Sequence, residues 1–149
     1  AHFFVFYFGV ASAITPPVAI AAYAAASISG GNPISTGVAS VRIGAAIFAL
    51  PFMFAYNPEM LLLTEAASEA GFFGVVMVMI RTLMLIWMLM SAANRFDAQR
   101  LGWPETALRL AIAAALISPV ATVHWIAIAA AVALGVLNRL RARAVVVQN

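Results

Sequence analysis

The sequence predicts an all-α integral membrane protein, and two observations carry that prediction. Apolar residues make up 65% of the chain and charged residues only 9%, with a mean hydropathy of +1.04, whereas about a quarter of the residues in soluble domains are charged. No Asp, Glu, Lys or Arg precedes Arg42, so the whole segment before it can enter hydrocarbon. Cysteine is absent, which excludes disulfides and thiolate metal sites.

The first apolar stretch, from Phe3 to Ile28, is long enough to cross a bilayer but is divided by Thr15-Pro16-Pro17. Two adjacent prolines remove two backbone donors and push Thr15 away from helical geometry. The sequence therefore predicts a discontinuous helix, with half-helices over 3–13 and 18–29. The second half is nearly all alanine, which allows close packing inside a helical bundle.

This break predicts a binding site for a cation and an organic anion. We expect carbonyl groups near Val10, Ala11 and Ser12 to lose their helical partners, and lipid cannot replace them. Interrupted helices of this kind hold ions and substrates in membrane transporters. The hydroxyls of Ser12 and Thr15 add oxygen ligands that suit sodium, a hard cation, and no acid or histidine lies within this span to relay protons. The competing interpretation is a simple kink in a packing helix.

Further apolar stretches predict further spans. A turn at Ser29–Pro33 leads to a short interfacial helix over 35–41, a kinked span over 42–56 that contains Pro51, and a third span over 71–93. Acidic residues without bases occupy 57–70, whereas Arg95 and Arg100 follow the third span. The positive-inside rule places 30–42 and 95–109 in the cytoplasm and 57–70 outside.

The last apolar segment, over 107–137, is too long for one straight crossing. As a single helix it would measure about 46 Å, against a hydrocarbon core of about 30 Å. It would also leave Arg139, Arg141 and Arg143 on the side opposite Arg95 and Arg100. We therefore expect a hairpin of two short helices that bends near Ser118-Pro119, with one long, kinked and tilted helix as the alternative.

Few side chains outside the break suggest chemistry. Arg81 lies near the centre of the third span and no acid shares that span, so it needs a carbonyl, an acid from a missing part of the protein, or an interface reached by snorkelling. His124 is expected to be a hydrogen-bonded residue at the hairpin bend. The methionines around Trp87 are typical of a lipid-facing or packing surface, and Tyr56, Trp103 and Trp125 of interfacial anchors. No residues for enzymatic catalysis are visible, and Glu105 suits the first turn of a helix.

Several of these motifs resemble the large permease of tripartite ATP-independent periplasmic (TRAP) transporters, in particular the fused permease that works with TAXI-type binding proteins. The motifs are Phe4-Val5-Phe6-Tyr7-Phe8, Ala13-Ile14-Thr15-Pro16-Pro17-Val18-Ala19, Gly31-Asn32-Pro33, Thr36-Gly37 and the stretch from Pro51 to Pro58. The resemblance is strong over about 2–63, and much less specific over Leu101-Gly102-Trp103-Pro104-Glu105 and the apolar stretch around Pro119.

The resemblance implies a sodium-coupled secondary transporter of the elevator type in a bacterial inner membrane. It implies import of small organic acids delivered by a periplasmic solute-binding protein, with sodium as coupling ion and no other cofactor. Residues 1–63 would end the transport domain and 64–149 form a membrane extension. The cation and substrate site would involve Ala11, Ser12, Ala13, Thr15 and Pro16, with Thr15 as the sodium ligand.

The chain opens on Ala1-His2-Phe3 without a basic region before its first apolar run, which argues against a signal peptide. We expect it to be the carboxy-terminal part of a longer polypeptide, in which an upstream region, a small subunit and membrane lipid are its partners. Nucleic acid is not an expected partner, because the net positive charge of +3 is explained by the membrane topology. A non-transporting scaffold subunit is the main rival function, and a membrane-embedded transferase around His124 is a weaker one.

Overall fold

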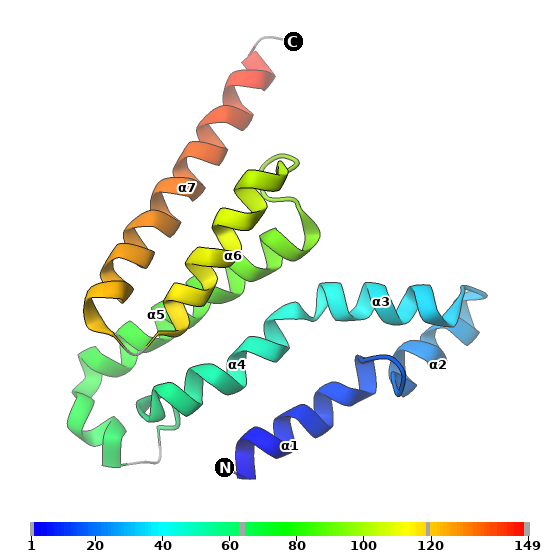
Figure 1. Ribbon diagram of the computed structural model, residues 1–149, viewed down its shortest axis with the longest axis horizontal. Helices are drawn as coiled ribbons and strands as arrows, with labels where there is room; N and C mark the ends of the chain where they lie inside the picture. The colour runs from blue at the N-terminus through cyan, green and yellow to red at the C-terminus, as the bar shows by residue number, and fades with distance from the viewer. Residues whose placement is uncertain (1, 63–64, 119, 148–149) are drawn as a thin grey trace.

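The computed structural model describes residues 2–62, 65–118 and 120–147, which form helices joined by short connections (Figure 1). The helices are α1 (His2–Ala11), α2 (Ile20–Ser29), α3 (Pro33–Ile43), α4 (Ala45–Tyr56), α5 (Glu65–Asn94), α6 (Trp103–Ile117) and α7 (Ala121–Val147), with 3-10 turns η1 (Ser12–Ile14) and η2 (Pro58–Met60). Within the described residues, Ser68–Asn94 and Thr122–Ala142 are long and apolar enough to cross a membrane, and α3 with α4 makes a third candidate. The expectation of an all-α chain with apolar spans is confirmed.

The predicted break in the first span is present. Helix α1 ends at Ala11, η1 continues to Ile14, and α2 begins only at Ile20. Thr15 is extended (φ −107°, ψ 118°), as expected for a residue that precedes proline. Ala19 then takes a left-handed conformation (φ 33°) and is fully buried.

The second span differs from its prediction. The sequence indicated an interfacial helix over 35–41 and a separate span over 42–56, but α3 and α4 are joined at Gly44 with a bend of 42° and together are apolar and long enough to form one broken span. Helix α3 begins early because the Asn32 side chain accepts a hydrogen bond from the Ser35 amide (3.0 Å). Pro51 lies buried inside α4 without ending it.

These two broken elements run side by side, with α1 against α4 and α2 against α3 (Figure 1). Aromatic rings join the first pair. The ring centroid of Phe52 lies 5.4 Å from that of Phe4 and 6.2 Å from that of Phe8, within the usual range for favourable edge contacts. The two breaks are thereby placed at the same level.

The remaining helices, α5 to α7, form a bundle (Figure 1). The hairpin prediction is confirmed, since α6 and α7 pack together and separate helices flank residues 118–120. Pro119 lies outside the described residues. Helix α7 reaches Val147 and is longer than the short helix expected. Its Asn138 contacts the loop after α5 (Asn138 Oδ1 to the Ala98 amide, 3.2 Å), so both arginine-bearing segments lie at the same end, as the hairpin predicted.

The apolar core lies among α4 and the three helices of this bundle. Fully buried members include Met53, Leu85, Met88, Leu116 and Ala131. The methionine-rich part of the third span therefore contributes to packing, which was one of its two expected roles, the other being a lipid-facing surface. Trp87 lies directly against Gly135 of α7, where an added Cβ would stand 2.1 Å from the indole ring.

Candidate functional site

The helix break brings together all five residues predicted to form a site. Ala11 ends α1, Ser12 and Ala13 form η1, and Thr15 and Pro16 lie in the turn that follows. Ala11 is buried and the other four are half-buried. A single local interruption therefore places backbone carbonyls and two hydroxyls within residues 11–16.

The carbonyls of Ala11 and Ser12 find other partners in place of the bonds of a regular helix. The Thr15 hydroxyl donates to the Ala11 carbonyl (2.7 Å). The Ser12 carbonyl accepts from the Thr15 amide (3.1 Å) and from the Ala19 amide (3.2 Å). These carbonyls are bonded by groups of the break itself, because the turn after η1 folds back on η1. Ala19 adopts its left-handed conformation to complete that turn.

These bonds still leave oxygen lone pairs. A carbonyl oxygen has two lone pairs, so the Ser12 carbonyl, which accepts two bonds, has none left, whereas a hydroxyl that donates its proton keeps both of its own. Thr15 spends its proton on Ala11, so its Oγ1 lone pairs are free to face a cation. The arrangement offers neutral oxygen ligands, and among the described residues no group of three or more His, Cys, Asp or Glu side chains could hold a metal ion.

A second break, which sequence reasoning did not connect to the first, packs directly against it. The Ser40 hydroxyl lies 2.8 Å from the Ile14 carbonyl, across 26 residues, and also 2.8 Å from the Gly37 carbonyl. A Cβ at Gly37 would stand 2.9 Å from Pro16 Cγ, and one at Gly44 2.8 Å from Ile14 Cδ1. Both glycines permit this close approach. The Thr36-Gly37 motif was a sequence signal, but nothing in it indicated which segment it would contact.

Arg81 has partners that its sequence context did not reveal. Its side chain is buried, Nη1 lies 2.9 Å from His124 Nδ1, and Nη2 donates to Asn57 Oδ1 (3.0 Å). The Asn57 side chain supplies a carbonyl oxygen, which is one of the partners expected for Arg81, whereas the contact with His124 was not expected. Because Arg81 donates to Nδ1, the proton of a neutral His124 is on Nε2, which donates to the Ser118 carbonyl. His124 is thus the hydrogen-bonded residue expected at the bend.

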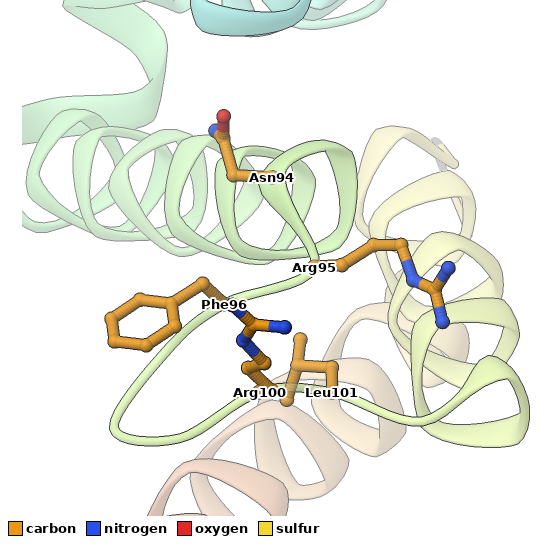
Figure 2. Close-up of a pocket in the computed structure, with 5 residues that line it drawn as sticks. All are labelled: Asn94, Arg95, Phe96, Arg100 and Leu101. Carbon is orange, nitrogen blue, oxygen red and sulfur yellow. The ribbon is translucent and has the colours of Figure 1, made fainter.

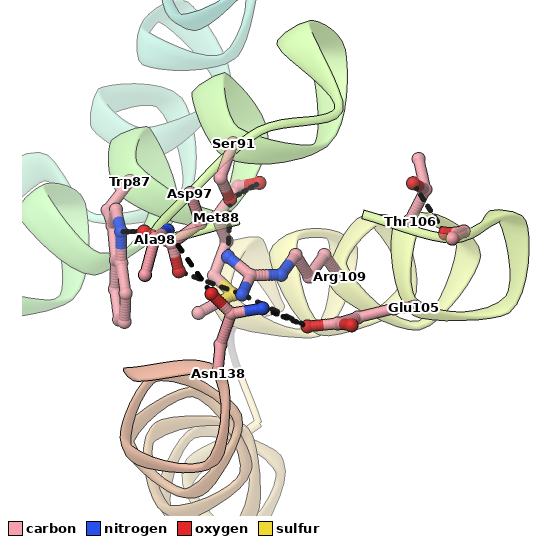
Figure 3. A network of polar contacts seen from close by, with 10 residues as sticks. Trp87, Met88, Ser91, Asp97, Ala98, Glu105, Thr106, Arg109 and Asn138 are labelled. Atoms are coloured by element: carbon pink, nitrogen blue, oxygen red, sulfur yellow. Dashed lines mark hydrogen bonds and ion pairs between the residues drawn. The ribbon is translucent and has the colours of Figure 1, made fainter. Parts of the chain in front are cut away.

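Arg109 forms a second buried cluster, which the sequence analysis missed (Figure 3). It is completely buried and reaches Ser91 Oγ (2.7 Å), Asp97 Oδ2 (2.9 Å) and Glu105 Oε1 (3.3 Å). Asn138 also donates to Glu105 (3.1 Å), so the cluster joins α5, α6, α7 and the loop between the first two. Glu105 lies in the first turn of α6, as predicted, and its spacing of four residues from Arg109 was the sequence signal for this ion pair.

Interrupted helices beside apolar spans define a helical membrane protein. Residues 1–69 match the family model described as tripartite ATP-independent periplasmic transporter, DctM component. This match supports the resemblance to TRAP large permeases, which are membrane transporters and not a family of enzymes. It covers both breaks and the start of α5. No curated protein and no solved structure matches the chain.

Proposed function

We propose that this chain is part of a TRAP permease, a sodium-coupled secondary transporter that imports small organic acids. The observation that carries the proposal is the break over residues 11–19, an uncharged cluster of carbonyl and hydroxyl oxygens inside an apolar helix. Sodium is a hard cation and suits such ligands. The beginning of a half-helix adds a partial positive charge, which suits an anionic substrate.

The residues proposed to hold cation and substrate are Ala11, Ser12, Ala13, Thr15 and Pro16. Thr15 Oγ1 is the proposed side-chain ligand of sodium. Its hydrogen bond to Ala11 orients the hydroxyl so that the lone pairs point away from the carbonyl. The rest of the site would come from a facing part of the permease.

We infer the wider setting from the resemblance to TRAP permeases. The permease would work in the bacterial inner membrane, in several crossings, with a periplasmic solute-binding protein of the TAXI type that delivers the substrate. Residues 1–63 would move with the transport domain in an elevator-type cycle, while 64–149 form the extension. Under the positive-inside rule, the end of the bundle that carries Arg95 and Arg100 faces the cytoplasm.

Sodium-driven uptake tests the proposal. The full-length permease and its binding protein are placed in proteoliposomes, and uptake of a radiolabelled organic acid is measured over a range of sodium gradients. Thr15→Val keeps the side-chain shape but removes the hydroxyl, so we expect the sodium concentration for half-maximal uptake to rise roughly ten- to hundredfold. Thr15→Ser keeps the hydroxyl and should remain near wild type.

Thr106→Val is the matched control. Thr106 makes the same type of bond to a carbonyl four residues earlier (2.9 Å), but in α6, away from the break. Uptake by the Thr106→Val variant should show the same sodium dependence as uptake by the wild type. If Thr15→Val also behaves like wild type, the hydroxyl is not a sodium ligand, and if the wild type shows no sodium-dependent uptake, the scaffold function replaces the transporter.

A further inference from the structure

Exposed arginines gather at one end of the terminal bundle, defined as α5 to α7. Arg95 and Arg100 lie in the loop after α5, and Arg139 and Arg141 lie near the end of α7. All four are exposed. They are brought to the same end because Asn138 bonds both the loop amide of Ala98 and Glu105 at the start of α6.

The acidic residues at this end do not neutralise those arginines. Asp97 and Glu105 both turn inward to Arg109, and their side chains are only 14% and 19% exposed. The ion pairs found within residues 2–62, 65–118 and 120–147 are those two, so the exposed arginines have no carboxylate partner there. The buried cluster thereby leaves an uncompensated positive surface.

A hollow of about 440 Å³ opens in this surface, lined by Asn94, Arg95, Phe96, Arg100 and Leu101 (Figure 2). Its volume lies within the roughly 300–1,000 Å³ typical of ligand pockets. Arg100 lies beside Phe96, and Arg95 extends toward α6, where its guanidinium stacks 4.3 Å above the ring of Trp103. Stacking holds the plane of Arg95 while leaving its N–H edges open to an anion.

Apolar groups border the same hollow. Phe96, which lines the hollow, is 57% exposed. Trp103, on which Arg95 stacks, is 74% exposed, and the apolar spans of α5 and α7 end at this level. A free anion would make no use of exposed aromatic rings, whereas a lipid places its phosphate beside arginines and its acyl chains along apolar helices. Guanidinium groups bind phosphate oxygens in pairs.

We propose that this hollow binds the phosphate head group of an anionic phospholipid, with Arg95 and Arg100 as its main ligands. The bound lipid would tie the loop over 95–102 to the membrane surface. This site is independent of the cation site at the helix break, and neither proposal requires the other.

Lipid retention by the full-length permease tests the site. The detergent-purified protein is titrated with phosphatidylglycerol or phosphatidylcholine, and bound lipids are counted by native mass spectrometry. Wild type should retain phosphatidylglycerol in preference to phosphatidylcholine. Arg95→Asn/Arg100→Gln should weaken that preference about tenfold or more, and asparagine tolerates the left-handed conformation of residue 95 (φ 52°).

Two control variants keep the result interpretable. Arg95→Lys/Arg100→Lys keeps the charge and should retain most of the preference, and Arg42→Gln removes an exposed arginine from the end of α3 and should change nothing. Equal retention of both lipids by wild type, or an unchanged preference in Arg95→Asn/Arg100→Gln, would overturn the proposal. Displacement of phosphatidylglycerol by millimolar inorganic phosphate would instead assign the hollow to a free anion.

Discussion

The paired broken helices, α1 to α4, and the terminal bundle, α5 to α7, find partners for their buried polar groups in different ways. In the former, Arg42 is the sole Asp, Glu, Lys or Arg, and hydroxyls such as those of Thr15 and Ser40 bond to carbonyls at the breaks. The bundle instead buries two arginines, Arg81 and Arg109. Neutral bonds leave oxygen lone pairs for a ligand, whereas buried charges need several partners and therefore connect helices.

The largest expected effect is the loss of a buried charge in the terminal bundle. Arg109→Met should destabilise the protein by about 3–5 kcal/mol, because it leaves Asp97 and Glu105 as poorly solvated charges without their partner. Thermal unfolding of the purified full-length permease would measure it. Adding Asp97→Asn and Glu105→Gln should recover much of the loss, and a single variant as stable as wild type would show that the cluster does not connect the bundle.

Arg81 offers a smaller effect with a matched control. Asn57→Leu removes a hydrogen-bond acceptor of a buried guanidinium, which should cost about 1.5–3 kcal/mol. Asn94 makes the same bond as Asn57 to a carbonyl four residues earlier (both 2.9 Å), but it is exposed and has no arginine partner. Asn94→Leu should therefore cost much less. Equal losses in the same unfolding assay would mean that Asn57 acts only through its local bond.

Packing within the bundle can be tested at Gly135. Gly135→Ala would place a Cβ 2.1 Å from the Trp87 ring, and the resulting displacement should cost about 1–3 kcal/mol. Gly9→Ala is the control, because a Cβ there has nothing within 4 Å. Trp87→Phe should relieve part of the cost, so the two substitutions should show favourable coupling in a double-mutant cycle. Additive effects would contradict this contact.

The smallest expected effect is the loss of a neutral hydrogen bond in the paired broken helices. Ser40→Ala removes a hydroxyl between the two breaks and should cost about 1 kcal/mol. Ser27 bonds only the Tyr23 carbonyl of its own helix (3.0 Å) and is exposed, so Ser27→Ala should cost less. Differential unfolding midpoints would compare them, and an equal change would show that the bond across the breaks adds nothing.

Local chemistry made much of the fold predictable. The break at Thr15-Pro16-Pro17 follows from the covalent geometry of proline, and the hairpin follows from the length of 107–137 against the thickness of a bilayer. The bend at Gly44 was missed because glycine in an apolar run does not by itself bend a helix. Its role depends on Ile14 lying within 2.8 Å of an added Cβ.

The sequence by itself determined an apolar helical chain, its interruption and the residues gathered there, because these depend on neighbours along the backbone and on hydrophobic length. Only the tertiary structure decided that Arg81 contacts Asn57 and His124, and that Ser40 contacts Ile14, across separations of 24, 43 and 26 residues. A buried charge or hydroxyl requires a partner, but many side chains could supply one. Helix packing selects which of them comes within hydrogen-bonding distance.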